Sequence, residues 1–202
     1  MRLTMADSLD EEFKGRRARF ETEILPLMPE AYRFALRLTR RPEDARDIVQ
    51  DAYLRAFRTF GNFRPGTNAK AWLFTILYSV FVNRWHKERR ESSVSIEDLE
   101  EEFPRLLAVE DPAVIRESLS TRPAEWAQPE VDAALQRLPE AFRSALLLVE
   151  VEELTYEEAA AALGCPIGTL RSRLFRARKA LYLALREFAA RAGYGPPRPE
   201  TK

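Results

Sequence analysis

The sequence of 202 residues predicts an all-α protein of two small helical domains joined by an acidic linker. Three observations lead to this fold class. Leu and Ala are abundant and only 7 glycines occur, a composition that favours helices over sheet. Apolar residues recur at helical spacing in two blocks, about residues 10–90 and 129–192. Between them, residues 91–128 lose that spacing and are interrupted by prolines, which is typical of a linker.

The first block, residues 10–90, is expected to hold several helices. The spacing predicts one helix from Leu27 to Leu38 and a second from about Pro42 to Phe60. Residues 61–68 form a loop by composition, and a long helix follows from about Ala69 to Arg89. The apolar stripes of the second and the long helix comprise Ala45, Ile48, Val49, Ala52, Tyr53, Ala56 and Phe57, and Leu73, Leu77, Val80 and Phe81.

Aromatic and basic side chains alternate through the second half of this block. The rings are Phe57, Phe60, Phe63, Trp72, Phe74, Tyr78, Phe81 and Trp85, and the cations are Arg55, Arg58, Arg64, Lys70, Arg84, Lys87, Arg89 and Arg90. Unpaired bases need a ring for stacking, worth roughly 1–3 kcal/mol per base, and positive charge along the backbone. Phe57, Phe74 and Phe81 are expected in the core because of their helical spacing. Phe63, in a Gly/Pro loop beside Arg64, is either buried or exposed and functional.

The formal net charge of zero hides a local asymmetry. Residues 91–111 carry eight acidic side chains against Arg105 alone, whereas residues 167–191 carry seven basic side chains against Glu187 alone. Because salt screens distant charges, local sign decides the partner. The basic end is expected to bind nucleic acid and the acidic middle to avoid it. The linker is assigned one short helix near Ser95–Glu100, and residues 193–202 are expected to be disordered.

The second block contains the pattern of a helix-turn-helix between Leu154 and Leu181. Thr155 and Glu158 have the spacing of a capping box at a helix start. Ala159, Ala160, Ala161 and Ala162 keep that first helix slim, so that a second helix can cross it closely. Gly164 supplies a residue that tolerates positive φ at the turn, and Pro166 fits the first turn of the next helix.

The second helix of this pattern has two different faces. Its inner stripe is expected to be Leu170, Leu174, Ala177 and Leu181, and its outer stripe Arg171, Ser172, Phe175, Arg176 and Lys179. Guanidinium forks, a hydroxyl and an apolar ring on one stripe suit a helix that lies in a DNA major groove. A solvated basic face is the other interpretation, but an exposed Phe among arginines contributes little to solubility.

Several classes of protein are excluded by what the sequence lacks. It has no run of eighteen apolar residues and no secretory signal, so a soluble cytoplasmic protein without membrane insertion is expected. Cys165 is the only cysteine, which excludes an internal disulfide and a thiolate zinc site. Cys165 with His86 as base would be the obvious catalytic pair, but Cys165 lies where a small apolar residue packs in the turn. No enzyme activity, metal or cofactor is therefore expected.

The ordered pair of blocks resembles a bacterial sigma factor of the extracytoplasmic-function group (ECF, group 4) of the sigma-70 family. The segment PEDARDIVQDAYLRAFRTFGNFRPGTNAKAWLFTIL resembles that family's second conserved region. The segment LQRLPEAFRSALLLVEVEELTYEEAAAALGCPIGTLRSRLFRARKAL resembles its fourth. The resemblance implies a factor that joins core RNA polymerase, directs it to −35/−10 promoters and assists promoter melting, and it suggests a role in a stress or envelope response.

The resemblance also assigns site residues by position. The surface for the clamp of the largest polymerase subunit comprises Asp47, Val49, Gln50 and Asp51, although Val49 also suits a helix core. The −10 set comprises Phe63, Arg64, Asn68, Lys70, Ser79 and Asn83. The −35 set comprises the base readers Arg171, Ser172, Phe175 and Arg176, with Thr169, Arg173 and Tyr156 expected at phosphates. Many relatives carry Asn where this chain has Ser79, and a hydroxyl forks less than an amide, so the preferred −10 base is expected to differ.

Further partners follow from the same resemblance. The fourth region is expected to dock the flap of the second-largest polymerase subunit, and an anti-sigma factor is expected to hold the chain in a groove between its domains. The acidic linker has a counterpart that threads the polymerase toward its RNA exit path, while composition alone equally allows a solvated spacer.

Two other functions fit part of the sequence. A helix-turn-helix repressor or activator, with the first block as a dimerisation or ligand domain, explains the second block but not the aromatic and basic loop. A protein that binds polymerase without reading DNA is the other. Repressor operators are usually palindromic, so the symmetry of the DNA footprint separates the first of these from a sigma factor.

Overall fold

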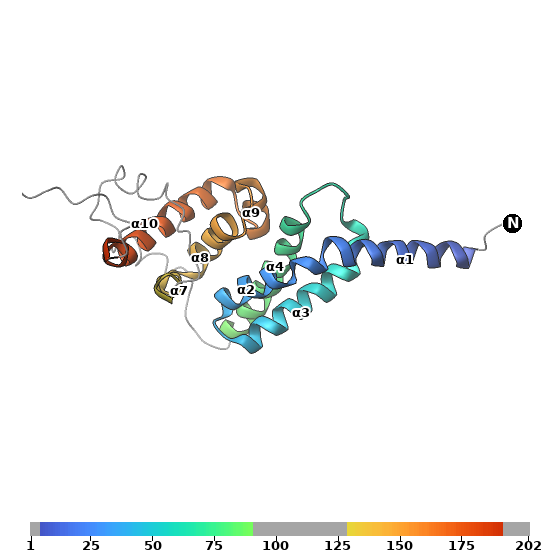
Figure 1. Cartoon of the computed structure of the whole chain (residues 1–202), viewed down its shortest axis with the longest axis horizontal. Coiled ribbons are helices and arrows are strands. Elements are labelled where there is room, and N and C mark those ends of the chain that lie inside the picture. The colour runs from blue at the N-terminus through green and yellow to red at the C-terminus, as the bar shows by residue number, and fades with distance from the viewer. Residues whose placement is uncertain (1–4, 91–128, 192–202) are drawn as a thin grey trace, which may run out of the picture. The chain divides into compact units, whose positions relative to one another are not determined.

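The computed structural model describes residues 5–90 and 129–191, which divide into an N-terminal and a C-terminal helical unit (Figure 1). Every regular element within these two ranges is a helix, so the predicted all-α class is confirmed. The expected acidic linker over residues 91–128, with its short helix near Ser95–Glu100, lies outside the described residues. The expected disordered tail over residues 193–202 lies outside them as well.

The N-terminal unit consists of four α-helices and two short 3₁₀ turns within residues 5–90 (Figure 1). These elements are α1 (Met5–Glu23), η1 (Leu25–Leu27), α2 (Met28–Thr39), α3 (Pro42–Thr59), η2 (Phe60–Asn62) and α4 (Ala69–Arg90). The three helices and the loop that the sequence predicts agree with α2, α3, α4 and residues 61–68 to within about a residue at each end. Helix α1 is an addition, since the sequence did not delimit a separate helix before Leu27.

Local chemistry explains where these helices begin and end. Helix α2 ends because Arg40 adopts φ 64°, a left-handed conformation that stops the helix. Pro42 then occupies the first turn of α3, where its missing N–H costs nothing. Asn68 caps α4, because the backbone N–H of Ala71 donates to its side-chain oxygen at 3.2 Å. These signals fix the two loops that flank α3.

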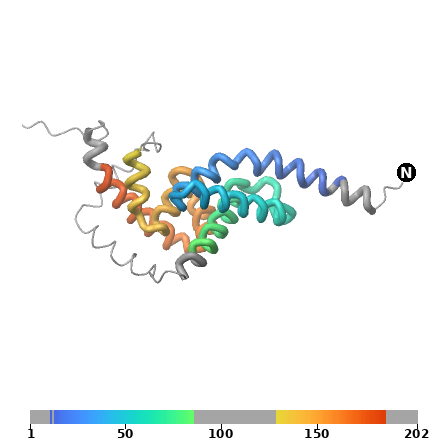
Figure 2. Tube along the Cα trace, turned by 90° about the horizontal axis from the view of Figure 1, so that it is seen from below, coloured from blue at the N-terminus to red at the C-terminus, as the bar shows by residue number. Residues whose placement is uncertain are grey.

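Large apolar side chains from all four helices form the core of the N-terminal unit. The most deeply buried are Ile24, Phe34, Ile48, Phe60, Leu73, Phe74 and Leu77. Phe20 of α1 lies 5.2 Å from the Phe57 ring and 5.3 Å from the Phe60 ring, both nearly perpendicular. These ring contacts hold α1 along the C-terminal half of α3 (Figure 2).

The C-terminal unit contains four α-helices within residues 129–191. They are α7 (Pro129–Arg137), α8 (Glu140–Leu146), α9 (Tyr156–Leu163) and α10 (Ile167–Arg191), and α8 continues into a π-helical turn, η3 (Leu147–Val151). The N–H of Glu152 donates to the carbonyl of Leu147 at 2.9 Å, which closes the π turn. Glu153 then adopts φ 59° and leads the chain into α9.

The helix-turn-helix details follow the sequence closely. The N–H of Thr155 donates to Glu158 Oε2 at 2.9 Å, and the N–H of Glu158 donates to Thr155 Oγ1 at 3.2 Å, so the capping box is confirmed. Gly164 has φ +62° at the turn. The predicted inner stripe of α10 is also confirmed, because its four members are buried: Leu170, Leu174, Ala177 and Leu181.

One member of the outer stripe was placed wrongly. Lys179 is only 9% exposed, so it does not belong to the exposed basic face of α10. Its position two residues from both Ala177 and Leu181 brings it to the edge of the packed stripe. A long aliphatic stem can be covered there by its apolar neighbours.

Candidate functional site

The exposed face of α10 carries the four predicted base readers. Arg171, Ser172, Phe175 and Arg176 are all exposed, and the Phe175 ring is 48% exposed. Ser172 Oγ donates to the carbonyl of Thr169 at 2.8 Å, which orients the hydroxyl and leaves its lone pairs to accept. A ring this exposed beside two guanidinium groups offers an apolar contact and hydrogen-bond forks on one surface.

A polar network fixes α10 against the preceding elements. Arg178 Nε donates to Glu150 Oε1 at 3.0 Å, a second guanidinium nitrogen contacts the same oxygen, and Arg178 also donates to the Tyr156 hydroxyl oxygen at 3.4 Å. Burial opposes the charge of Arg178, yet the hydrogen bonds to Glu150 and Tyr156 outweigh it and raise its pKa. The network therefore joins η3, α9 and α10 through a permanently charged arginine.

The three predicted phosphate contacts of this unit are less exposed than the base readers. Thr169, Arg173 and Tyr156 are each half-buried. The Tyr156 oxygen accepts from Arg178, so its own O–H can still donate to an anion. Their partial burial distinguishes these three side chains from the four exposed base readers.

In the N-terminal unit, the structure shows the buried one of the two alternatives for Phe63. Phe63 is only 4% exposed, with its ring centroid 5.5 Å from that of Phe60 and 5.1 Å from that of Trp72. The N–H of Phe63 donates to the Phe60 carbonyl at 3.0 Å, and this tight turn points both rings to the same side. Phe63 therefore belongs to the core beneath the loop, packed between Phe60 and Trp72.

The other members of the −10 set are distributed over the loop and α4. Arg64 and Asn83 are exposed, and Lys70 is half-buried with its ammonium 5.6 Å from the Phe74 ring centroid. Asn68 is exposed but its side chain caps α4, a structural role that the sequence prediction missed. A following helix start is the signal that identifies such a cap.

Ser79 has a partner that the sequence did not reveal. Arg55 of α3 donates to Ser79 Oγ at 3.4 Å, and Ser79 is half-buried. The hydroxyl is thus held beside a guanidinium group that also faces solvent. A strand that meets Ser79 would meet Arg55 as well.

The residues expected to contact the polymerase clamp lie on α3. Asp47, Gln50 and Asp51 are exposed, whereas Val49 is only 7% exposed, in agreement with its core alternative. Asp47 Oδ2 accepts from Arg84 of α4 at 2.8 Å. An ion pair this exposed contributes little to stability, but it links α3 to α4.

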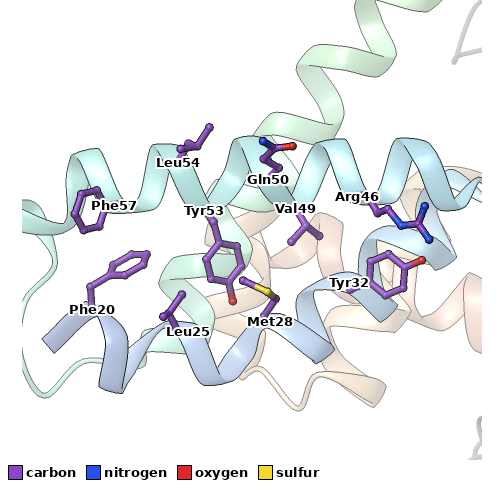
Figure 3. A pocket seen from close by; sticks show the side chains of 10 residues that line it. All are labelled: Phe20, Leu25, Met28, Tyr32, Arg46, Val49, Gln50, Tyr53, Leu54 and Phe57. Carbon is purple, nitrogen blue, oxygen red and sulfur yellow. The ribbon is translucent and has the colours of Figure 1, made fainter. Parts of the chain in front are cut away.

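An apolar groove runs beside these residues, between the η1–α2 segment and α3 (Figure 3). Its volume is about 580 Å³, and its lining is Phe20, Leu25, Met28, Tyr32, Arg46, Val49, Gln50, Tyr53, Leu54 and Phe57. Leu25, Met28 and Leu54 are 39%, 43% and 49% exposed. The sequence prediction missed this groove, although Leu54 is an apolar residue outside the buried stripe of its helix.

The Tyr53 hydroxyl forms the polar floor of this groove. It donates to the carbonyl of Ile24 at 3.1 Å, and the ring is 8% exposed. Burial, together with the negative charge of Glu30, raises the pKa of the Tyr53 hydroxyl above its ordinary value. The hydroxyl therefore stays neutral and ties the residue before η1 to α3.

Other chemistry is limited in the part of the chain that the structure describes. Its side chains include no group of three or more His, Cys, Asp or Glu that could hold a metal ion. Among its helices, none combines the length and apolarity that a bilayer span requires. Cys165 is half-buried in the turn before α10, and the His86 side chain lies outside the described residues.

Comparison with protein families matches both units. Residues 24–91 match the family model described as Sigma-70 region 2, and residues 129–181 match the one described as Sigma-70, region 4. The first match covers α2, α3, α4 and the loop between them. The second covers the helix-turn-helix and the two helices before it.

Individual relatives and solved structures agree with this match. The chain is 37% identical to the ECF RNA polymerase sigma factor EcfG of Rhodopseudomonas palustris, over 79% of the chain and 81% of that protein. It is 33% identical to the RNA polymerase sigma-H factor of Pseudomonas aeruginosa, over 85% and 89% of the two chains. Among solved structures, it resembles the sigma factor RpoE in complex with the anti-sigma factor NepR from Bartonella quintana, with a TM-score of 0.61, 33% identity and coverage of 83% and 96%.

Proposed function

The chain belongs to the extracytoplasmic-function sigma factors of the sigma-70 family, and we propose that its two helical units divide the work of such a factor between separate surfaces. It is an RNA polymerase sigma factor, a protein that directs core polymerase to promoters and has no enzymatic activity of its own.

The exposed face of α10 reads the −35 element. The observation that carries this assignment is the 48% exposed Phe175 ring between exposed arginines on a helix fixed by the Arg178 network. Arg171 and Arg176 supply forks that match guanine, and Phe175 can contact a thymine methyl. Thr169, Arg173 and Tyr156 bind phosphates at the border of this face.

The loop at residues 61–68 and the exposed side of α4 meet the −10 element. Arg64, Lys70 and Asn83 supply the contacts to the strand, and Ser79 acts together with Arg55. Phe63 supports the loop from below and makes no base contact, because it is buried. Asn68 acts through the position of α4, since its side chain holds the first turn of that helix.

The α3 face binds the clamp of the largest polymerase subunit. Asp47, Gln50, Asp51 and Leu54 share one side of α3 at spacings of three and four residues, and all are exposed. Gln50 and Leu54 also line the apolar groove (Figure 3). A polar stripe beside an apolar groove is the usual composition of a protein interface, where an apolar centre is surrounded by polar groups.

Four further assignments rest on the family alone. The C-terminal unit docks the flap of the second-largest polymerase subunit, and an anti-sigma factor holds the chain inactive, as NepR binds the relative from Bartonella quintana. The protein acts in the cytoplasm, because its partners, core polymerase and promoter DNA, are found there. Its regulon belongs to a stress or envelope response.

Run-off transcription with purified core polymerase tests the function directly. Genomic fragments are transcribed with and without this chain, and a sigma factor gives transcripts that depend on it. Arg171→Ala with Arg176→Ala should abolish transcription from −35-dependent promoters while leaving core association intact. Arg137→Ala, an exposed arginine on α7, serves as the matched control.

A two-fold symmetric footprint without polymerase would contradict this proposal, because it would indicate a repressor or activator instead of a sigma factor.

A charge reversal on α3 tests the clamp assignment. Asp51→Lys is expected to lose association with core polymerase, and the exposed Glu43→Lys on the same helix is the control. Equal association of both variants would remove the clamp assignment.

A further inference from the structure

Helix α1 precedes the residues that match the region 2 model, and it carries an exposed basic and aromatic face. Lys14, Arg16, Arg17 and Arg19 are all exposed, and the Phe13 ring is 45% exposed. None of the functions assigned above uses this face. An exposed ring among four cations therefore needs its own explanation.

Ring contacts place this face beside the end of α3. Phe13 lies 6.5 Å from the Phe57 ring, nearly perpendicular, and Phe20 packs on Phe57 and Phe60. Phe20 is 5% exposed, so it anchors the helix, whereas half of Phe13 stays open to solvent. The position of α1 is thus set by its buried ring and leaves Phe13 available.

The arginines of α1 adjoin the loop that is assigned to the −10 strand. The Arg19 guanidinium carbon lies 5.3 Å from the Phe60 ring centroid, and a Cβ built on Gly61 would lie 3.9 Å from Arg16 Nη1. The Arg16 guanidinium carbon also lies 5.4 Å from the Phe13 ring centroid. Arg16 therefore stands between the exposed ring and the first residue of the loop.

The charges of α1 differ in how they are compensated. Arg17 pairs with Glu21 at 2.8 Å and Arg19 pairs with Glu23 at 2.9 Å, both across one helical turn. No carboxylate among the described side chains pairs with Arg16. Exposed pairs of this kind contribute little to stability, so their arginines can also bind a phosphate.

We propose that Phe13, Arg16 and Arg19 form a second contact for unpaired promoter DNA, so that the strand bound at the loop of residues 61–68 continues onto α1. The proposal rests on the function proposed above. Phe13 supplies the ring on which a base stacks, and Arg16 and Arg19 neutralise phosphates on either side. The contact does not depend on base identity, since every base has a π-face.

Single-stranded DNA fits this face better than other partners. Duplex phosphates would need the cations alone, because stacked bases expose no face to the Phe13 ring. An acidic protein surface would likewise use the cations and leave the ring against polar groups. The combination of an open ring with an adjacent arginine is the composition of single-strand sites.

Equilibrium binding of the holoenzyme to labelled oligonucleotides tests the proposal. The probes are fluorescein-labelled non-template strands of a promoter from which the holoenzyme transcribes. The short strand ends at the −10 element, and the long strand extends beyond it on both sides. Phe13→Leu, which keeps an apolar contact with Phe57, should weaken binding of the long strand about fivefold or more and leave the short strand unchanged. Arg16→Gln should reduce the slope of log affinity against log salt by about 0.7 for the long strand.

Arg33→Gln, an exposed arginine on α2 instead of α1, is the matched control and should change neither value. Wild-type affinities for the long strand in both Phe13→Leu and Arg16→Gln would overturn the proposal. A parallel loss of core polymerase binding would also overturn it, in favour of a protein contact. Failure of the unaltered holoenzyme to bind either strand would instead overturn the proposed function.

Discussion

The α10 face and the loop before α4 carry the two sets of predicted DNA contacts, and they differ in the exposure of their aromatic side chain. On α10, the aromatic candidate Phe175 is exposed beside its arginines. In the loop, the aromatic candidate Phe63 is buried against Phe60 and Trp72. The difference teaches that a ring beside an arginine in sequence is informative only where a regular helix decides which way each side chain points.

The largest difference between the two regions is expected when the Phe63 ring and the Phe175 ring are each removed. Phe63→Ala should lower the free energy of unfolding by about 3–5 kcal/mol, because it opens a cavity in the core. Phe175→Ala should change it by less than about 0.5 kcal/mol, because the ring is largely exposed, and should instead weaken −35 binding. Urea unfolding and gel shifts on the same two variants measure both effects. A stable Phe63→Ala protein with impaired strand binding would restore Phe63 as a base contact.

The next largest effect concerns the arginines of the same two regions. Arg171→Ala should weaken −35-dependent binding by about 1–3 kcal/mol and relax specificity at one base pair, if it makes a bidentate contact. Arg64→Ala in the loop should weaken binding nearly uniformly across sequences, as a phosphate contact does. Holoenzyme binding to promoters with single base changes separates the two patterns. A uniform loss in Arg171→Ala would remove it from the base readers.

A smaller effect is expected when the polar network of Arg178, which holds α10 against η3 and α9, is disrupted. Glu150→Gln removes the carboxylate that pairs with the half-buried Arg178, and should lower the free energy of unfolding by about 1–2 kcal/mol. Promoter affinity should fall without a change in salt slope, because no phosphate contact is lost. Thermal unfolding and salt titration of binding test this. A reduced slope would show that Arg178 itself reaches DNA.

The smallest effect is a pH dependence confined to the N-terminal unit. Tyr53→Phe removes the hydrogen bond to Ile24 and should cost about 1 kcal/mol near neutral pH. Burial raises the Tyr53 pKa above its ordinary 10.0, so its contribution to stability is complete below pH 10 and is lost as the pH rises above that value. The difference between the two proteins in urea unfolding should therefore narrow above pH 10. A constant difference would contradict the raised pKa.

Helical periodicity explains which parts of the fold were predictable. The bounds of α2, α3 and α4, the capping box at Thr155 and the buried stripe of α10 all follow from local spacing and caps. Lys179 was misplaced because it lies at the border between two faces, where small rotations decide burial. Helix α1 has almost no apolar stripe of its own, and its position depends on the packing of Phe20 against Phe57 and Phe60.

The candidate site was predictable only in part, for a related reason. Side chains that act from one helix face, such as Arg171 and Phe175, were predicted with their exposure. Features made by two segments were not, because their partners are far apart in sequence. The Arg178–Glu150 pair, the Arg55–Ser79 contact and the groove along α3 all belong to this second kind.

Gly164 lies at the centre of the turn between α9 and α10 and limits which residues can replace it. It has φ +62°, yet a Cβ built there would meet no atom within 4 Å. Alanine would therefore fit by volume and still be disfavoured by roughly 1–2 kcal/mol, because an L-residue resists this backbone conformation. The position therefore favours glycine, the one achiral amino acid, because of its backbone conformation and not because neighbouring atoms crowd it.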